Sequence, residues 1–312
     1  MVLSLQKITL GLVSLCLFAS CSNTPAANSV RDALSADPRL TNSSPSPQAS
    51  PSPSPSDSPT PSPETTTEPS PTPSATPAPT VDSSSSFSDL DKAPQALRQA
   101  VKETAELGIL THSNSAKANE STVFEPNKNV TRRVYARWLV AANNRIYSTR
   151  PARQIRLAVE SSTPAFKDVP TKDPDFASIQ GLAEAGLIPS SLSGDSTASL
   201  FRPDAPLTRE DLILWKIPVD TRQVLPNATI ESVKQSWGFQ DANKIDAKAL
   251  RAVYADFQNG DQANIRRAFA YTTLFQPKRP VTRAEAAAVL SYFGFQGDGI
   301  SAQEALKGTP KP

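Results

Sequence analysis

The stretch Phe201-Arg202-Pro203-Asp204-Ala205-Pro206-Leu207-Thr208-Arg209 decides the fold, because its two landmarks recur elsewhere in the chain. A Phe-x-Pro turn is followed by a Thr-Arg pair 7 residues later in three places, and successive pairs lie 77 and then 74 positions apart. A Phe-x-Asp triplet precedes each turn, at Phe87-Ser88-Asp89, Phe166-Lys167-Asp168 and Phe239-Gln240-Asp241. Three landmarks in one order and nearly one period predict three repeated structural units.

Each unit is predicted to be a helix, a loop and a second helix. Apolar residues recur at helical spacing between Phe176 and Ala183, and Gly186 follows as a C-cap. The second helix is expected to begin at the threonine. Thr208 with Asp211, and Thr282 with Glu285, fit a capping box, in which the hydroxyl and the carboxylate satisfy backbone amides.

The chain begins with the features of a bacterial lipoprotein signal. Lys7 is followed by an apolar stretch, Ile8 to Phe18, and then by Ala19-Ser20-Cys21. A spanning helix needs roughly 20 apolar residues, so this stretch is too short to cross a membrane. The sequence therefore predicts cleavage before Cys21 and lipidation of that cysteine. The alternative is an ordinary secretory signal.

A proline-rich spacer separates this signal from the repeats. Residues 44–80 consist almost entirely of Pro, Ser, Thr and Ala. Such a segment cannot bury a core and favours polyproline II, so its length would reach roughly 115 Å at about 3.1 Å per residue. A flexible linker or a glycosylated stalk is the alternative.

These observations divide the chain into six parts. The predicted parts are a signal peptide at 1–20, a disordered linker at 21–86, three repeat units at 87–142, 166–220 and 237–294, and a disordered tail at 295–312.

The repeats resemble the S-layer homology domain. The resemblance rests on Phe-x-Asp, the helix ending Leu182-Ala183-Glu184-Ala185-Gly186-Leu187-Ile188, the Phe-x-Pro loop and Val281-Thr282-Arg283-Ala284-Glu285. It implies an all-α fold in which three repeats form a pseudo-threefold spindle. It also implies that the grooves between repeats bind a cell-wall polysaccharide or a peptidoglycan-linked polymer. With the lipoprotein signal and the tether, the chain is similar to envelope proteins of cyanobacteria.

The units depart from the family pattern in places. The first unit reads Thr131-Arg132-Arg133-Val134, so the acidic residue of the capping box is missing. The third unit lacks a clear Leu-Ala-Glu-x-Gly ending around Arg251 to Phe257. These departures leave open whether all three grooves bind.

Arg132, Arg209 and Arg283 are the main candidate ligand residues. Each is expected at the first helical position, where a cation opposes the helix dipole at a cost of roughly 0.3–1 kcal/mol. A helix N-terminus presents amide donors, and a guanidinium beside it can clamp the carboxylate of an acidic sugar. The alternative is that each arginine pairs with a carboxylate of the neighbouring unit and joins the units together.

Asp89, Asp168 and Asp241 have two further predicted roles besides that pairing. They are candidates to cap the first helix of each unit. They are also candidates to bind sugar hydroxyls, together with the three arginines.

The charge distribution favours an anionic partner. No acidic residue lies between Glu125 and Glu160, or between Asp261 and Glu285, although both windows are rich in arginine.

Sequence motifs for common catalytic and metal sites are absent. His112 is the single histidine, and no cysteine besides Cys21 follows the predicted cleavage site, which excludes the common zinc sites. No phosphate-binding loop, dinucleotide-binding glycine pattern or nucleophile elbow occurs.

The sequence thus predicts a non-enzymatic envelope lipoprotein without cofactor or metal. Its acylated Cys21 would sit in a bilayer, and Ser22 is compatible with outer-membrane sorting, facing the periplasm. Its repeats would bind an anionic wall polymer and tether the membrane to the wall. The alternative is a lipoprotein scaffold whose repeats bind another protein, and a wall-modifying enzyme is a third hypothesis. Nucleic acid is not expected as a partner.

Overall fold

The computed structural model describes residues 87–110 and 122–308. The predicted signal peptide, the linker with Cys21, and the segment 111–121 with His112 lie outside the described residues.

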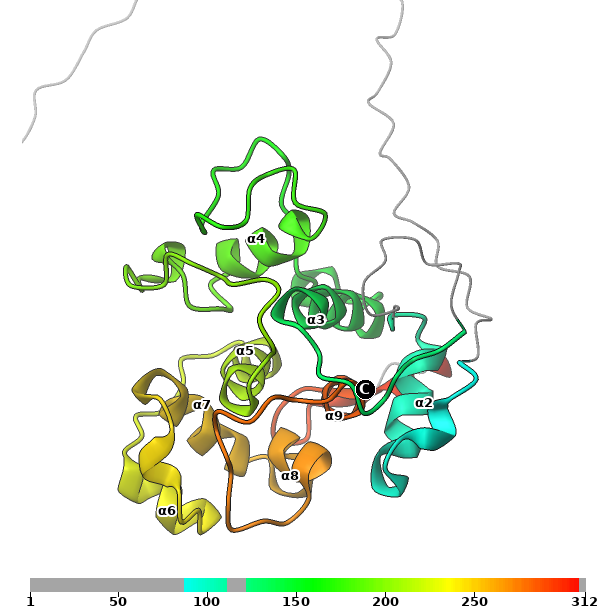
Figure 1. The fold of residues 1–312 in the computed structure, drawn as a ribbon, viewed down its shortest axis with the longest axis vertical. Coiled ribbons are helices and arrows are strands. Elements are labelled where there is room, and N and C mark those ends of the chain that lie inside the picture. The colour runs from blue at the N-terminus through cyan, green and yellow to red at the C-terminus, as the bar shows by residue number, and fades with distance from the viewer. Residues whose placement is uncertain (1–86, 111–121, 309–312) are drawn as a thin grey trace, which may run out of the picture. The chain divides into compact units, whose positions relative to one another are not determined.

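Within these ranges the protein is mostly helical, which confirms the predicted all-α class (Figure 1). The longer elements are α2 (Arg98–Glu106), α3 (Arg132–Ile146), α4 (Phe176–Glu184), α5 (Arg209–Thr221), α6 (Ile230–Trp237), α7 (Ala247–Phe257), α8 (Asn264–Phe269), α9 (Arg283–Leu290) and α10 (Ala302–Leu306). Short 3-10 turns lie at Leu90–Lys92, Gln95–Leu97, Pro151–Arg153, Ser191–Ser193, Ala242–Lys244 and Gly260–Gln262. One small antiparallel pair joins β1 (Tyr292–Phe293) and β2 (Ile300–Ser301).

The three units interlock in a cycle. The first helix of each unit packs against the second helix of the preceding unit: α4 against α3, α7 against α5, and α2 against α9. Figure 1 shows α3, α5 and α9 near the centre, with α4, α7 and α2 around them. Thr104 on α2 donates a buried hydrogen bond of 3.0 Å to the carbonyl of Ala287 on α9. Each unit therefore completes the hydrophobic packing of its neighbour.

A closed ring of hydrogen bonds marks the pseudo-threefold axis. The amide of Val130 donates to the carbonyl of Val281, that of Val281 to Leu207, and that of Leu207 back to Val130, at 2.9, 2.8 and 2.9 Å. These residues precede the three Thr-Arg pairs, so α3, α5 and α9 all begin at this ring.

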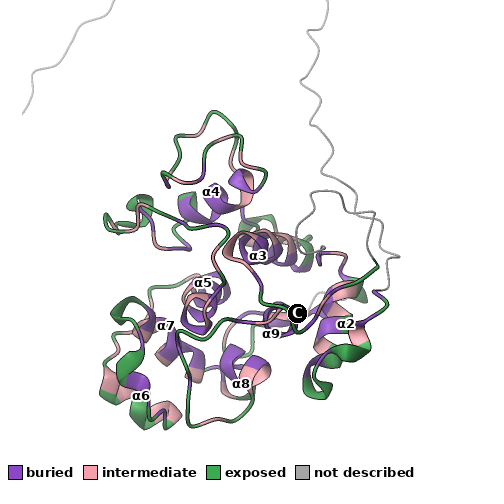
Figure 2. Cartoon of the chain, in the orientation of Figure 1, coloured by how far each residue is buried: buried purple, intermediate pink, exposed green. Residues whose placement is uncertain are grey.

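The core lies along the same three helices (Figure 2). Trp138 on α3 and Trp215 on α5 are fully buried, and each stacks on the phenylalanine of its own Phe-x-Pro loop, Phe124 or Phe201. The conserved spacing between that phenylalanine and the helix therefore sets how each loop meets the core.

Residues 295–308 differ from the prediction of a disordered tail at 295–312, of which 309–312 lie outside the described residues. Ile300 pairs with Phe293 in the sheet and is 5% exposed, and Ala302 at the start of α10 is fully buried. Ser301 and Glu304 form a capping box at the start of α10. Strand pairing and the capping box hold residues up to Leu306 in place. The sequence did not indicate this order because the segment has no long apolar stripe.

None of the helices within 87–110 and 122–308 is long and apolar enough to span a bilayer.

Candidate functional site

The aspartate of each Phe-x-Asp triplet holds the Phe-x-Pro loop of its own unit. The two carboxylate oxygens of Asp241 accept hydrogen bonds from the amides of Phe275 and Gln276, at 2.9 and 2.8 Å. The carboxylates of Asp168 and Asp89 accept the equivalent pairs of amides in the other two units.

This arrangement contradicts the predicted capping role of Asp89 and Asp241. Asp89 and Asp241 precede the first turn of their units but make no side-chain cap bond there. Both are buried, with 4% and 6% of their surface exposed. The expectation that they cap the first helix is therefore wrong, because their oxygens are already used to hold the loop.

The loop held in this way is bent at the middle residue of Phe-x-Pro. Glu125, Arg202 and Gln276 adopt φ values of 56, 57 and 54°, in the left-handed region that non-glycine residues rarely occupy. Turning the two amides toward one carboxylate stabilises this conformation. The loop is thereby directed toward the second helix of the preceding unit.

The helix N-termini are not open anion sites. The amide of Arg209 donates to the carbonyl of Arg279 and the amide of Glu210 to that of Pro277, at 3.0 and 3.1 Å. The first two amides of α3 and α9 donate in the same way to the loops of the next unit in the cycle. The expectation that these amides bind an anion is wrong, because backbone carbonyls of the neighbouring unit occupy them.

The three arginines reach across the unit boundaries. Nε of Arg132 donates to the carbonyl of Phe201, and Nε of Arg283 to that of Phe124, both at 2.7 Å. Arg209 makes the equivalent bond to Phe275 through Nη1 at 3.1 Å. Their guanidinium groups also lie over aromatic rings of the next unit, which compensates for an unfavourable position near the helix dipole.

Carboxylates complete this contact at the boundaries of Arg132 and Arg209. Arg132 pairs with Asp211 at 2.6 Å, and Arg209 pairs with Glu285 at 3.4 Å. At the third boundary Val134 occupies the position that corresponds to Asp211 and Glu285. Burial lowers the pKa of Arg283 there to about 10. The arginines thus join the units, with partners other than the three aspartates named from the sequence.

The capping threonines also differ among units. Oγ1 of Thr282 accepts from the amide of Glu285, whose carboxylate accepts from the amide of Thr282, and this completes a capping box. Thr208 accepts from the amide of Asp211 and donates to its carboxylate. Thr131 makes no side-chain cap bond.

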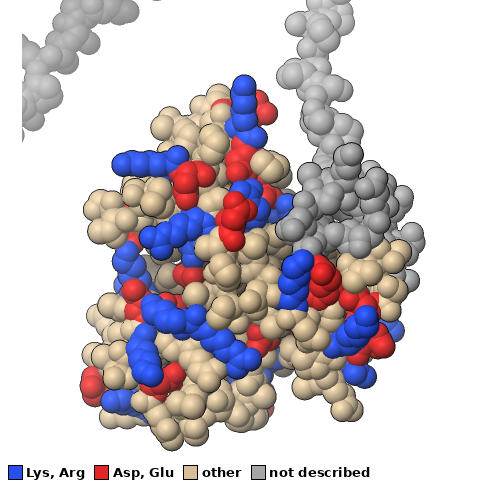
Figure 3. Space-filling model, viewed as in Figure 1, with Lys and Arg blue, Asp and Glu red and all other residues tan. Residues whose placement is uncertain are grey.

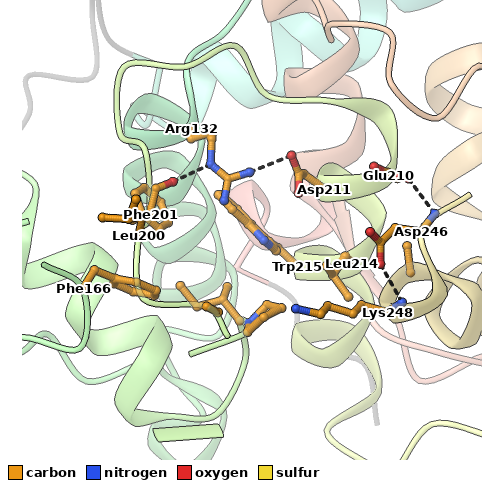
Figure 4. Close-up of a pocket in the computed structure, with 14 residues that line it drawn as sticks. Arg132, Phe166, Leu200, Phe201, Glu210, Asp211, Leu214, Trp215, Asp246 and Lys248 are labelled. Carbon is orange, nitrogen blue, oxygen red and sulfur yellow. Dashed lines mark hydrogen bonds and ion pairs between the residues drawn. The ribbon is translucent and has the colours of Figure 1, made fainter. Parts of the chain in front are cut away.

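A first groove lies beside Arg132 and has a volume of about 160 Å³ (Figure 4). In Figure 4 the Arg132 guanidinium lies over Trp215 and points toward Asp211, while Lys248 approaches from the opposite side. Its ionic lining contains two cations, Arg132 and Lys248, and three carboxylates, Glu210, Asp211 and Asp246. This balance disfavours an anionic ligand.

A second groove lies beside Arg209 and is larger, at about 730 Å³. Four arginines and two carboxylates line it, namely Arg209, Arg266, Arg267, Arg279, Glu103 and Glu285. Nε of Arg209 and Nε of Arg266 are buried and have no hydrogen-bond partner among the described residues. Burial lowers the pKa of Arg209. This groove combines excess positive charge with unused donors.

The surface around the groove beside Arg209 is also rich in cations. Figure 3 shows Lys and Arg side chains gathered over the segment that leads into α9, between α5 and α8. Lys278 and Arg279 in this segment are exposed. Nη1 of Arg279 donates to Gln276 rather than to a carboxylate.

The sequence indicated Arg209 as a candidate ligand residue and Glu285 as a helix cap through their repeat positions. It did not assign Arg266, Arg279 or Phe269, which line this groove from unit 3, to a site. Arg266 and Arg279 lie within the acid-free window 262–284, and that window was the one available signal.

Comparison with known families identifies one segment. Residues 165–213 match the S-layer homology domain, which covers the second unit from its Phe-x-Asp triplet to the first turn of α5. Domains of this family are binding modules of the cell envelope that associate with wall polymers. No curated protein matches the chain.

Proposed function

We propose that this protein is an envelope lipoprotein that tethers a membrane to the cell wall through non-covalent binding of an anionic wall polymer. The S-layer homology match at 165–213 supports wall-polymer binding in general terms. The lipid anchor on Cys21, the cleaved signal peptide, the outer-membrane location and the cyanobacterial type are further parts of this proposal, and they rest on the sequence alone.

The observation that carries the proposal is the groove beside Arg209. A carboxylate or phosphate of the polymer would meet the exposed Arg279 in this groove, which the half-buried Arg266 also lines. A guanidinium binds such groups with two parallel hydrogen bonds, and these are strong when partly shielded from water. The apolar face of a sugar ring would lie near Phe269, above which Arg209 is already placed at 4.0 Å.

The two grooves are proposed to differ in function. The groove beside Arg132 has more carboxylates than cations in its lining, so we assign it to joining the units rather than to binding an anion. An anchored domain gains effective concentration at the wall, so one groove of modest affinity is sufficient for a tether.

Co-sedimentation with purified peptidoglycan sacculi tests this assignment. The full chain, kept soluble in non-ionic detergent, is compared with Arg279→Gln. Arg279 is exposed, and a surface substitution of this kind changes the free energy of unfolding by less than about 0.5 kcal/mol. We expect binding to fall at least fivefold while the unfolding transition stays in place.

Arg202→Gln is the matched control, because Arg202 is an exposed arginine on the equivalent loop of unit 2. We expect it to bind as the unsubstituted protein does. Equal loss in both variants would indicate nonspecific charge attraction, and unchanged binding of Arg279→Gln would exclude the groove. Binding to a protein partner with no binding to sacculi would favour a scaffold, and soluble fragments released from the wall would favour an enzyme.

A further inference from the structure

Five arginines gather at the ends of α3 and α5 that lie away from the hydrogen-bonded ring. They are Arg145, Arg150, Arg153, Arg156 and Arg222, and we call this surface the distal basic face. Both helices begin at the ring, and α3 has 15 residues, so the face lies roughly 21 Å from Arg132 along that helix.

Backbone and side-chain contacts bring these residues together. Asn144 and Ile155 exchange two hydrogen bonds of 2.7 and 2.8 Å, which hold the segment that carries Arg156 against the last turn of α3. Nη2 of Arg222 donates to the carbonyl of Arg153 at 3.0 Å. The face is therefore held by the fold and is not an accident of long side chains in solvent.

Three of the five arginines of the face form no ion pair with the described residues. Arg145, Arg153 and Arg156 have no carboxylate within 4.0 Å among the described residues. Burial and the nearby charge of Arg153 lower the pKa of Arg222. Crowding like charges costs free energy, and a bound anionic surface would offset that cost.

Three carboxylates lie near the face, and one of them, Glu160, is exposed four residues after Arg156. Asp220 is buried and accepts from Lys216, so its charge is already paired. Asp298 is exposed and lines a polar pocket of about 150 Å³ together with Arg153. They leave the positive charge in excess.

Helix capping accounts for part of this arrangement. Cations are favourable near helix C-termini, which explains Arg145 in the last turn of α3 and Arg222 after α5. Arg156 lies outside the helices and has no such role.

Exposed aliphatic side chains flank the arginines. Leu157 and Val159 lie one and three residues after Arg156 and are 47% and 53% exposed, and Val224 is 91% exposed two residues after Arg222. Cations bordered by exposed aliphatic groups fit a bilayer interface, where arginines meet lipid phosphates and aliphatic side chains enter the headgroup region. A hydrated polysaccharide has no apolar layer into which the side chain of Val224 could insert.

We propose that the distal basic face docks on an anionic lipid bilayer. This contact is separate from the grooves, because the two surfaces lie at opposite ends of α3, and it does not depend on the polymer-binding proposal. One domain would then contact lipid at the distal basic face and leave the ring and its grooves free.

Fluorescence quenching in vesicles tests the proposal. Thr149 is exposed between Arg145 and Arg150, and Thr149→Trp places an indole at the face. The full chain with this substitution is bound to vesicles whose lipids carry bromine near the top of the acyl chains. The unsubstituted chain supplies the background of the natural tryptophans. We expect additional quenching in vesicles with 30 mol% phosphatidylglycerol but not in pure phosphatidylcholine, and a decrease with added salt.

The charge dependence is then tested by substitution. With Thr149→Trp in place, Arg145→Gln, Arg153→Gln and Arg156→Gln together should reduce the added quenching at least fivefold. Lys167→Gln, Lys234→Gln and Lys244→Gln remove the same charge from exposed residues elsewhere and should leave it unchanged. Thermal unfolding checks that both triple variants fold.

Quenching that is equal in neutral and anionic vesicles would overturn the proposal, because it would reflect the N-terminal apolar segment alone. Equal loss in both triple variants would also overturn it. Loss of sacculus binding in the arginine variant, with vesicle quenching unchanged, would assign the face to a wall polymer instead.

Discussion

Arg132 of the first unit and Asp211 of the second form an ion pair of 2.6 Å across a unit boundary, in the place where the sequence suggested a ligand site. The same arginine donates to the Phe201 carbonyl and lies 4.6 Å from the centre of the Trp215 ring. The main role of Arg132 is therefore to join the first and second units. The candidate binding surface lies instead in the groove beside Arg209.

A double-mutant cycle at this boundary should measure the coupling. Arg132→Gln and Asp211→Asn each remove one charge, and the side chains are 18% and 22% exposed, so water screens part of the attraction. We expect a coupling energy of about 1 kcal/mol in denaturant unfolding. Additive effects of the two substitutions would show that the pair does not hold the units together.

Substitution of an aspartate that holds a Phe-x-Pro loop should lower the free energy of unfolding by more than the coupling energy of the Arg132–Asp211 pair. Asp241→Asn replaces one accepting oxygen by an amide group that faces a backbone N–H, and the site is buried. We expect a decrease of about 2–3 kcal/mol in the free energy of unfolding. Asp298→Asn, at an exposed site, is the control and should change it by less than about 0.5 kcal/mol. Similar small effects at both positions would contradict the role given to Asp241.

The two threonines Thr282 and Thr131 should respond differently to the same substitution. Thr282→Ala removes a capping bond to the amide of Glu285 and should destabilise the protein by about 1 kcal/mol. Thr131→Ala should have almost no effect, because Oγ1 of Thr131 is buried without a hydrogen-bond partner among the described residues. Chemical denaturation of both variants measures the difference, and equal destabilisation would argue against the assigned caps.

Stability should rise with pH in the alkaline range because of Lys216. Burial lowers the pKa of Lys216 from 10.5 to about 8, so the unfolded chain binds more protons between these two values. We expect the free energy of unfolding to increase from pH 8 toward pH 10 and to level off below pH 8. The buried Tyr135 has a raised pKa, and it opposes this trend only where unfolded tyrosine ionises, near pH 10 and above.

Lys216→Met tests the source of that slope, because it removes the titrating group from a buried site beside Phe293. The variant should show a flat profile between pH 8 and 10 in denaturant unfolding. A slope that persists in Lys216→Met would have to come from other groups.

The repeats could be predicted from the sequence because their landmark residues make contacts within their own unit. Phe124, Phe201 and Phe275 fill the core, and the Phe-x-Asp aspartates hold loops within the same unit, so residue type and spacing are both constrained. The start of α5 and α9 at a threonine could be predicted for the same reason, because each threonine caps its own helix.

Relations between units could not be predicted in this way. That α2 packs against α9 depends on the closure of a cycle across the whole domain, and no spacing in the sequence encodes it. The amides at the start of α3, α5 and α9 looked free because their partners lie in the next unit. Of the cations beside Arg209, Arg266 comes from a segment with no repeat landmark, and Arg279 lies between two landmarks without belonging to either, so only their charge indicated them.

Co-sedimentation of the full chain with sacculi, before and after acid removal of their attached polysaccharide, tests the central claim most directly. The account predicts binding to untreated sacculi that is lost when the polymer is removed, and that Arg279→Gln weakens. Undiminished binding after acid treatment, or no binding to either preparation, would contradict the proposed tether to an anionic wall polymer.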